Sequence, residues 1–198
     1  MSASWKQDYP NIKHYYTHQI WPGACGSRSV EGDRLRERQR QLPKQFSNMS
    51  VLSTLGIRPG GGCHFLAEGY AAMARQLVPL VNQYNYGVEP KTSITPPNIL
   101  SASFVGGRKD EIKLVFDQDV KWEEEIIERF YLDDGSAELT AVGGSGKTIT
   151  LKLAGPSVAK NLSYVRGGKW RQEQAIIWGL NDFAALTFCE VPIELPED

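Results

Sequence analysis

Apolar residues are spaced differently in the two halves of this 198-residue chain. Between residues 66 and 84 they recur every three or four positions, which predicts an amphipathic helix with one stripe turned toward a core. Pro79 is expected to kink this helix without ending it. The stripe consists of Leu66, Tyr70, Met73, Leu77, Leu80, Val81 and Tyr84.

The other elements of the first half are shorter. A charged helix is predicted over residues 33–42, with short strands around residues 18–21 and 51–55. Two helices and two strands make only part of an α/β layer, because a parallel sheet must be covered on both faces and continued at its edge. We therefore expect residues 1–90 to be the C-terminal portion of a larger α/β domain.

The second half alternates apolar and polar residues with a period of two, which is typical of strands. The change of pattern follows residues 86–90 and the extended stretch Thr95-Pro96-Pro97-Asn98, which mark a domain boundary. Eight segments, at the spacing of a sandwich, predict an antiparallel β-sandwich over residues 91–198. The segments are residues 100–105, 112–116, 129–132, 139–142, 148–153, 162–165, 175–178 and 186–191.

Composition narrows the classes of function. The 22 basic and 23 acidic residues are interspersed, so we expect no nucleic-acid partner and no attraction to an anionic membrane. No apolar run approaches the roughly 20 residues of a membrane span, and the first residues lack the regions of a signal peptide. Three cysteines without Cys-x-x-Cys spacing argue against a zinc ribbon. A Cys25 to Cys63 disulfide and three reduced thiols both remain open.

One glycine-rich segment carries the clearest chemical signal. It reads Gly60-Gly61-Gly62-Cys63-His64-Phe65 and runs directly into the predicted long helix. Such a loop leaves an imidazole accessible, and the helix fixes its direction. Histidine exchanges protons near neutral pH, so it can accept a hydroxyl proton and return it to a leaving group. We interpret His64 as descending from a catalytic base, against the alternative of a loop histidine bonded to a carbonyl.

Other candidate residues favour structural interpretations. Ser27, Ser29 and Ser145 lie in glycine-containing loops, but none is in a Gly-x-Ser-x-Gly elbow. His14 and His18 are four residues apart, yet their aromatic and β-branched neighbours predict a strand, with both at the surface or an edge.

Two further segments resemble binding motifs only in part. Residues 143–148 match half of a phosphate-binding loop but lie between predicted strands, so we expect a hairpin turn. The acidic run Glu123-Glu124-Glu125 with Glu128 is expected to be solvated. No metal or cofactor site is predicted.

Three tryptophans lie in the β half: Trp122, Trp170 and Trp178. A tryptophan in a sandwich is more often a core residue than a platform for sugars. If two of them, for instance Trp122 and Trp170, are exposed on one face, stacking against sugar rings is favoured.

The run from Tyr15 to Gly87 resembles the C-terminal third of SGNH (GDSL-type) hydrolases, in particular the sialate O-acetylesterase-like carbohydrate esterases. The resemblance implies a flavodoxin-like α/β/α domain that removes acyl groups from sugars, followed by a β-sandwich module, here Thr95 to Pro192. The residues that carry it are Gln19-Ile20-Trp21-Pro22, Asp33-Arg34-Leu35-Arg36-Glu37, Gly62-Cys63-His64-Phe65, Gly69-Tyr70 and Tyr84-Asn85-Tyr86-Gly87.

The chain departs from the family pattern at two places. The family's Gly-Asp-Ser block and oxyanion-hole residues have no equivalent segment here. The family's last motif is Asp-x-x-His, and its histidine matches His64. At the position of the motif's aspartate, this chain has Gly61.

We therefore expect a fragment that is inactive or nearly so by itself, with an acylated carbohydrate as the partner of the intact family. Residues 1–90 are expected to self-associate through an exposed edge. The alternatives are a non-catalytic carbohydrate-binding or accessory module and a structural domain. Intact relatives are often exported, but the sequence leaves the compartment open.

Overall fold

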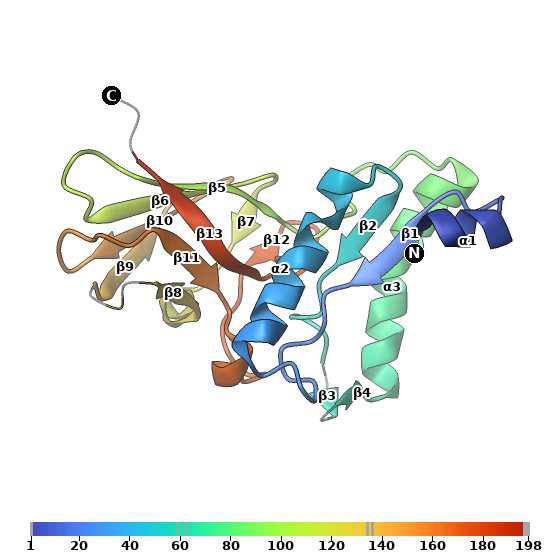
Figure 1. Cartoon of the computed structure of the whole chain (residues 1–198), viewed down its shortest axis with the longest axis horizontal. Helices are drawn as coiled ribbons and strands as arrows, with labels where there is room; N and C mark the ends of the chain where they lie inside the picture. The colour runs from blue at the N-terminus through green and yellow to red at the C-terminus, as the bar shows by residue number, and fades with distance from the viewer. Residues whose placement is uncertain (1, 59, 62, 134, 136, 196–198) are drawn as a thin grey trace.

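The computed structural model describes residues 2–58, 60–61, 63–133, 135 and 137–195. It shows a mixed α/β fold with few helices (Figure 1). In the first half, the parallel strands β1 and β2 are joined by the helix α2, and α3 follows after a small hairpin. The elements are α1 (Ser2–Asp8), β1 (Tyr15–His18), α2 (Val30–Gln45), β2 (Met49–Leu52), β3 (Gly60–Gly61), β4 (His64–Phe65) and α3 (Ala67–Tyr86).

Local sequence signals set the ends of both long helices. The Ser29 hydroxyl caps α2 by accepting a hydrogen bond from the Gly32 amide at 3.2 Å, which satisfies one free donor of the first turn. At the C-terminal end of α3, Gly87 adopts a left-handed conformation with φ of 71°, which glycine does without strain. Both predicted helices are confirmed, and α3 continues through Pro79. The short helix α1 was not predicted.

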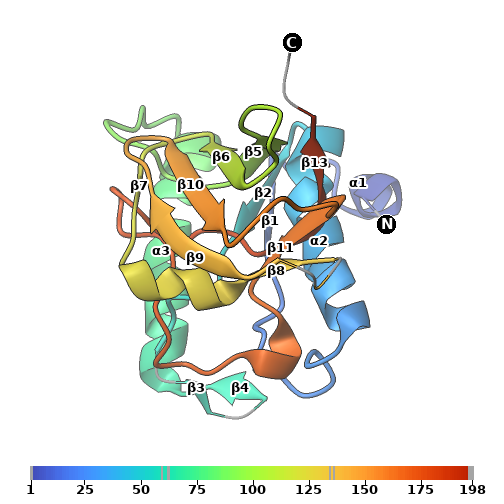
Figure 2. The same ribbon diagram turned by 90° about the vertical axis from the view of Figure 1, so that its left-hand side faces the viewer.

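The second half contains one curled sheet of seven strands in the order β8-β11-β13-β5-β6-β10-β9 (Figure 2). Its pairs are antiparallel except for β13 and β5, which run parallel. A separate two-stranded sheet joins β7 and β12. The elements are β5 (Ile99–Phe104), β6 (Glu111–Phe116), β7 (Val120–Lys121), η1 (Glu124–Arg129), β8 (Phe130–Leu132), β9 (Leu139–Gly143), β10 (Thr148–Leu153), β11 (Asn161–Tyr164), η2 (Gly167–Lys169), β12 (Trp178–Gly179) and β13 (Phe188–Glu194).

The main core lies inside the curl of this sheet. Strand residues such as Leu114, Phe116 and Leu151 are fully buried there, and each contributes about 1.5–3 kcal/mol relative to exposure. All eight predicted segments overlap a strand. The glycine-rich segment 143–148 is the turn between β9 and β10, as expected. The strand β7 was missed, because two residues are too few to show a period.

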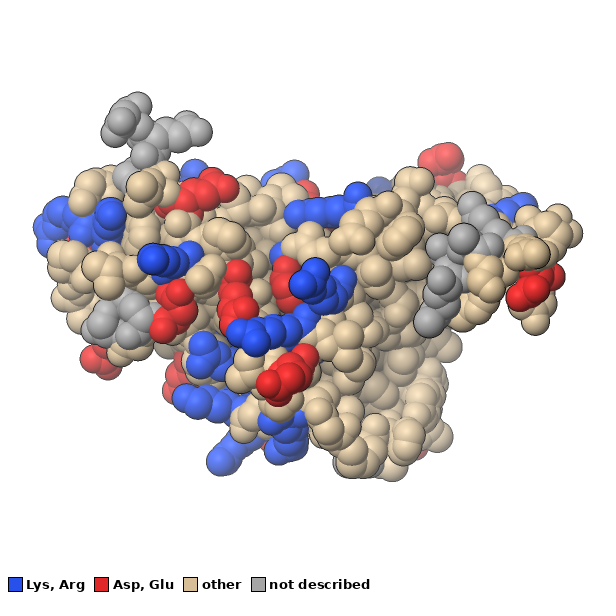
Figure 3. Space-filling model, viewed as in Figure 1, with Lys and Arg blue, Asp and Glu red and all other residues tan. Residues whose placement is uncertain are grey.

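The first half is covered much less completely. Neither β1 nor β2 pairs with a second strand among the described residues. Of the predicted α3 stripe, Leu80 alone is fully buried, whereas Leu66, Tyr70 and Tyr84 are exposed by 38–51%. The expectation that the whole stripe faces a core is therefore wrong for this structure. In Figure 3 charged side chains gather over α2 and the sheet, while the end with β1 and α3 shows few.

No helix in the described part of the chain combines the length and the apolarity needed to cross a membrane.

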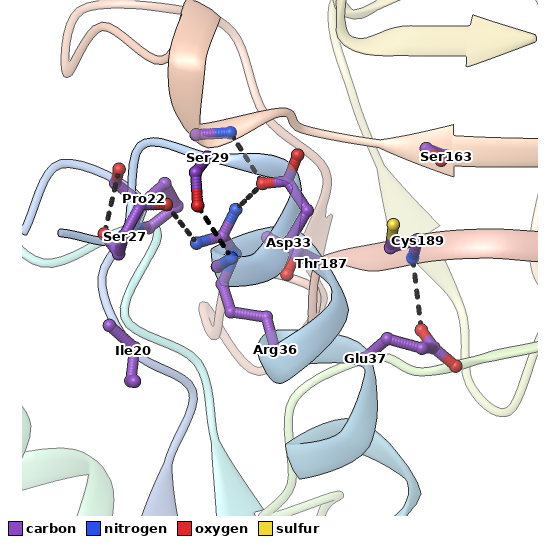
Figure 4. Close-up of polar contacts among 12 residues, drawn as sticks. Ile20, Pro22, Ser27, Ser29, Asp33, Arg36, Glu37, Ser163, Thr187 and Cys189 are labelled. Carbon is purple, nitrogen blue, oxygen red and sulfur yellow. Dashed lines mark hydrogen bonds and ion pairs between the residues drawn. The ribbon is translucent and has the colours of Figure 1, made fainter.

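A buried polar cluster joins α2 to the β half (Figure 4). Arg36 is fully buried and forms an ion pair with Asp33, one turn earlier in α2. The Asp33 carboxylate also accepts a hydrogen bond from the Gly167 amide at 2.8 Å. Burial lowers the pKa of Arg36, and the charge of Asp33 opposes that shift. A Cβ on Gly167 would lie 2.6 Å from the Ser27 carbonyl oxygen, so the approach requires glycine.

Further along the same contact, side chains pair with the backbone of the segment leading into β13. The Gln19 carboxamide accepts a hydrogen bond from the Thr187 amide at 2.8 Å and donates one to the Thr187 carbonyl at 2.9 Å. Glu37 accepts a bond from the Cys189 amide at 3.1 Å. Burial alone would raise the pKa of Glu37, but the bonds and charge of Arg40, with bonds from Gln41 and the Cys189 amide, together outweigh it and the pKa is lowered. The two halves thus meet through directed, buried polar contacts.

Candidate functional site

His64 lies in the short hairpin of β3 and β4, three residues before α3 begins. The pairing places Gly61 directly opposite His64, and residues opposite each other in a hairpin have Cβ positions about 5 Å apart. The His64 side chain is exposed to solvent.

The hairpin is anchored on both sides of His64. Cys63 forms a disulfide with Cys25, with 4.8 Å between their Cα atoms, which resolves the alternative left open by the sequence. Phe65 packs against Trp21 with ring centroids 5.3 Å apart, and against Tyr70 edge-on at 6.1 Å. The segment after β1 and the start of α3 therefore hold the two residues that flank His64.

No nucleophile accompanies His64 among the described residues, where its imidazole forms no hydrogen bond or ion pair. The Ser27 hydroxyl donates to the Trp21 carbonyl at 2.8 Å, and Ser29 caps α2. Ser145 lies in the turn between β9 and β10. The structural interpretation of these three serines agrees with their contacts.

A serine and a histidine do meet elsewhere in the first half. The Nε2 atom of His14 lies 2.8 Å from the Ser50 hydroxyl, and both residues are buried. The His14 ring also stacks on Tyr84 with centroids 3.7 Å apart, and burial lowers its pKa. The expectation of a surface position is wrong for His14, because this packing takes it into the interior. A buried pair without access for substrate is a structural contact.

The three tryptophans of the β half differ in burial. Trp170 is 3% exposed and belongs to the core, the more usual position for a tryptophan, so Trp122 and Trp170 do not form an exposed pair. Trp122 and Trp178 are half-buried and line one cleft of about 600 Å³. The sequence could not identify this pair, because the exposed faces depend on how the loop after β2 packs onto the β half.

Comparisons with known proteins support the fold. Neither a protein-family model nor a curated protein sequence matches the chain. A carbohydrate acetylesterase from Xanthomonas citri matches with a TM-score of 0.69 and 12% identity, over 95% of this chain and 44% of that chain. The N-terminal part of a bacterial S-layer protein gives a TM-score of 0.32 at 15% identity, over 85% and 38% of the two chains, which is too low to indicate a shared fold.

The likeness to the acetylesterase shows that the two proteins share a fold over the matching region. The chain spans less than half of that enzyme's length.

Proposed function

We propose that this chain is the C-terminal portion of a carbohydrate acetylesterase of the SGNH type, close to the sialate O-acetylesterase-like branch, in which His64 is the general base. In this proposal, residues 1–90 close a flavodoxin-like α/β/α domain. Residues 91–198 form its sandwich-type module. The fold shared with a carbohydrate acetylesterase supports the proposal, as does the anchored, solvent-accessible position of His64.

The chemistry follows from what an imidazole can do beside an activated hydroxyl. A serine oxygen from the remaining part of the domain attacks the acetyl carbonyl, and His64 takes its proton. Backbone amides stabilise the negative charge on the carbonyl oxygen. As the bond between the acetyl carbon and the sugar oxygen breaks, His64 gives the proton to that oxygen, which leaves as a sugar hydroxyl. Water then attacks the acetyl-serine by the same steps and releases acetate.

The observation that carries the proposal is the incomplete cover of the first half. A two-stranded parallel sheet with open edges lies beside a helix whose apolar stripe is only partly buried, with three of its seven residues exposed. Parallel sheets are stable when helices cover both faces and further strands extend the edges. The missing surface therefore matches in kind the strands and helices that carry the serine in an SGNH domain.

The catalytic part of the proposal is tested by ester hydrolysis in two chains. This chain alone should hydrolyse acetylated chromogenic esters near background, and His64→Ala should leave that rate unchanged. The reading frame extended upstream of Met1 should contain a Gly-Asp-Ser strand end. The extended chain should deacetylate sugars at a rate that His64→Ala lowers by about 10³-fold or more. Strong turnover by this chain alone, lost in His64→Ala, would overturn the proposal, as would an extended chain that does not need His64.

The uncovered surface also supports self-association of this chain through residues 1–90. Val78 and Tyr70 on α3 are 54% and 49% exposed, and exposed apolar patches favour association. Sedimentation should show concentration-dependent oligomers, and Val78→Lys with Tyr70→Lys should shift them to monomer. The matched control Val158→Lys, at an exposed valine of the β half, should not. A chain that stays monomeric at all concentrations contradicts this expectation.

A non-catalytic carbohydrate-binding module is the second candidate, favoured by the cleft that Trp122 and Trp178 line. It predicts glycan binding without any hydrolysis in the extended chain.

A further inference from the structure

A cleft of about 600 Å³ lies where the loop after β2 meets the β7–β12 sheet. This volume is within the range of sites that enclose small ligands. The cleft draws on three separate segments of the chain. Its lining includes Gly56, Arg58, Trp122, Glu173, Gln174 and Trp178.

Both indoles are held by packing on one side and border the cleft on the other. Trp122 and Trp178 pack against the main core while remaining half-buried. Lys121 of β7 pairs with Trp178 of β12 in the antiparallel register, and Trp122 directly follows β7, so the two rings come from adjacent segments of the chain. A Cβ on Gly56 would overlap the Trp178 ring, so that glycine lets the backbone of the first half lie against it. Rings fixed in this way lose little freedom when a flat ligand stacks on them.

The polar groups of the cleft are available and nearly balanced in charge. Among the described residues, the side chains of Arg58, Glu123 and Glu173 form no hydrogen bond or ion pair. Lys121 is already paired with Asp182 at 2.6 Å. One free cation beside two free carboxylates does not attract an anionic ligand, whereas both kinds of group bond well to neutral hydroxyls.

We propose that this cleft binds a neutral pyranose ring of a glycan, with Trp122 and Trp178 stacking on the apolar faces of the sugar and Glu173 and Arg58 bonding its hydroxyls. The inference rests on the proposed function for its link to catalysis. Arg58 lies two residues before β3, so one continuous segment leads from the cleft to the His64 hairpin. The cleft is then a subsite that holds the glycan backbone while an acetyl group lies at His64.

The test uses sugars without acetyl groups, so that it reports the cleft and not hydrolysis. The chain is titrated with cellohexaose, xylohexaose and mannohexaose by calorimetry and tryptophan fluorescence, with hexagalacturonate as the acidic comparison. At least one neutral hexasaccharide should bind saturably and more tightly than hexagalacturonate. Trp122→Ala should weaken it about tenfold or more, the effect of losing one stacked ring, and Glu173→Gln should weaken it several-fold.

Two further variants control for effects of substitution that do not involve stacking in the cleft. Tyr86→Ala removes an aromatic ring that is 76% exposed on α3, away from the cleft lining, and should leave binding unchanged. Trp178→Ala should weaken binding like Trp122→Ala. Because Trp178 packs on Gly56, circular dichroism must show that this variant is folded; if it is not, Trp122→Ala and Glu173→Gln carry the test.

Three results overturn the inference. They are no saturable binding of any neutral hexasaccharide in the millimolar range, binding of hexagalacturonate as tight as that of the neutral sugars, and binding that Trp122→Ala leaves unchanged. Each of these would leave the His64 experiment with the extended chain unaffected. Conversely, neutral-sugar binding that needs Trp122 would stand even if the extended chain proved inactive.

Discussion

Breaking the Cys25–Cys63 disulfide should lower the stability of the chain by an amount that its position in the sequence sets. The bond closes a loop with a sequence separation of 38 residues. The chain-entropy relation for a loop of this size gives about 4 kcal/mol at 25 °C, and measured values for disulfides are typically about 2–4 kcal/mol. Since the bond also anchors the residue beside His64, its loss should release the β3–β4 hairpin first.

The assay is urea unfolding of the oxidised chain, the reduced chain and the Cys25→Ser, Cys63→Ser double variant. With a slope near 2 kcal/mol per molar urea, the midpoint should fall by about 1–2 M on reduction. Cys189 is buried, and burial raises the pKa of its thiol, so it should not react. The double variant should match the reduced chain and ignore reductant. A midpoint that reduction moves by less than about 0.3 M, or that moves equally in the double variant, would refute the reasoning.

Three shorter predictions concern other contacts. Asp33→Asn leaves the buried Arg36 charge uncompensated and should lower the free energy of unfolding by about 3–5 kcal/mol, while replacing both by apolar residues should be far milder; equal losses in denaturant unfolding would contradict this. Burial lowers the pKa of His14, so as the pH falls the unfolded chain binds a proton there before the folded chain does, and the free energy of unfolding should decrease below about pH 6.5. His14→Gln should make this decrease with pH smaller. An unchanged dependence on pH would contradict the prediction. Gly56→Ala should displace the Trp178 ring and lower stability by about 1–3 kcal/mol, seen as a lower urea midpoint with altered tryptophan fluorescence; wild-type values for both would exclude the close approach.

The elements that the sequence predicted are those with a long, regular period. The helix α3 repeats over five turns, and β6 and β10 alternate over six residues each, so local pattern was enough. The apolar pattern placed the first strand around residues 18–21, three residues later than β1, whereas the neighbours of His14 and His18 predicted a strand where β1 lies. The Gln19 amide still donates to the Leu52 carbonyl of β2 at 2.9 Å, and the pairing ends beyond it, where the Ile20 amide donates to the Gln39 side chain at 2.9 Å. A one-dimensional pattern does not contain that contact.

For the candidate site too, some residues could be predicted from the sequence and others could not. His64 could be found from its glycine-rich neighbourhood, and the structure adds its two anchors. The cleft could not be found, because Trp170 has polar neighbours such as Lys169 and Arg171 but is buried, whereas Trp178 follows Ile177 but is only half-buried. The motif around Asp33 carried the family resemblance, yet its role here is the contact between α2 and the β half. Such long-range partners are invisible until the fold brings them together.

The carboxamide of Gln19 imitates a strand, because it offers the Thr187 backbone the donor and acceptor that a neighbouring peptide would supply. An insertion or deletion of one residue in either segment would move the Gln19 side chain away from Thr187 and leave both without a hydrogen-bond partner in the interior. The seven-stranded sheet therefore cannot be replaced by another sheet independently of the segment after β1. An engineered recombinant of this chain has to take Gln19 and Thr187 from the same parent.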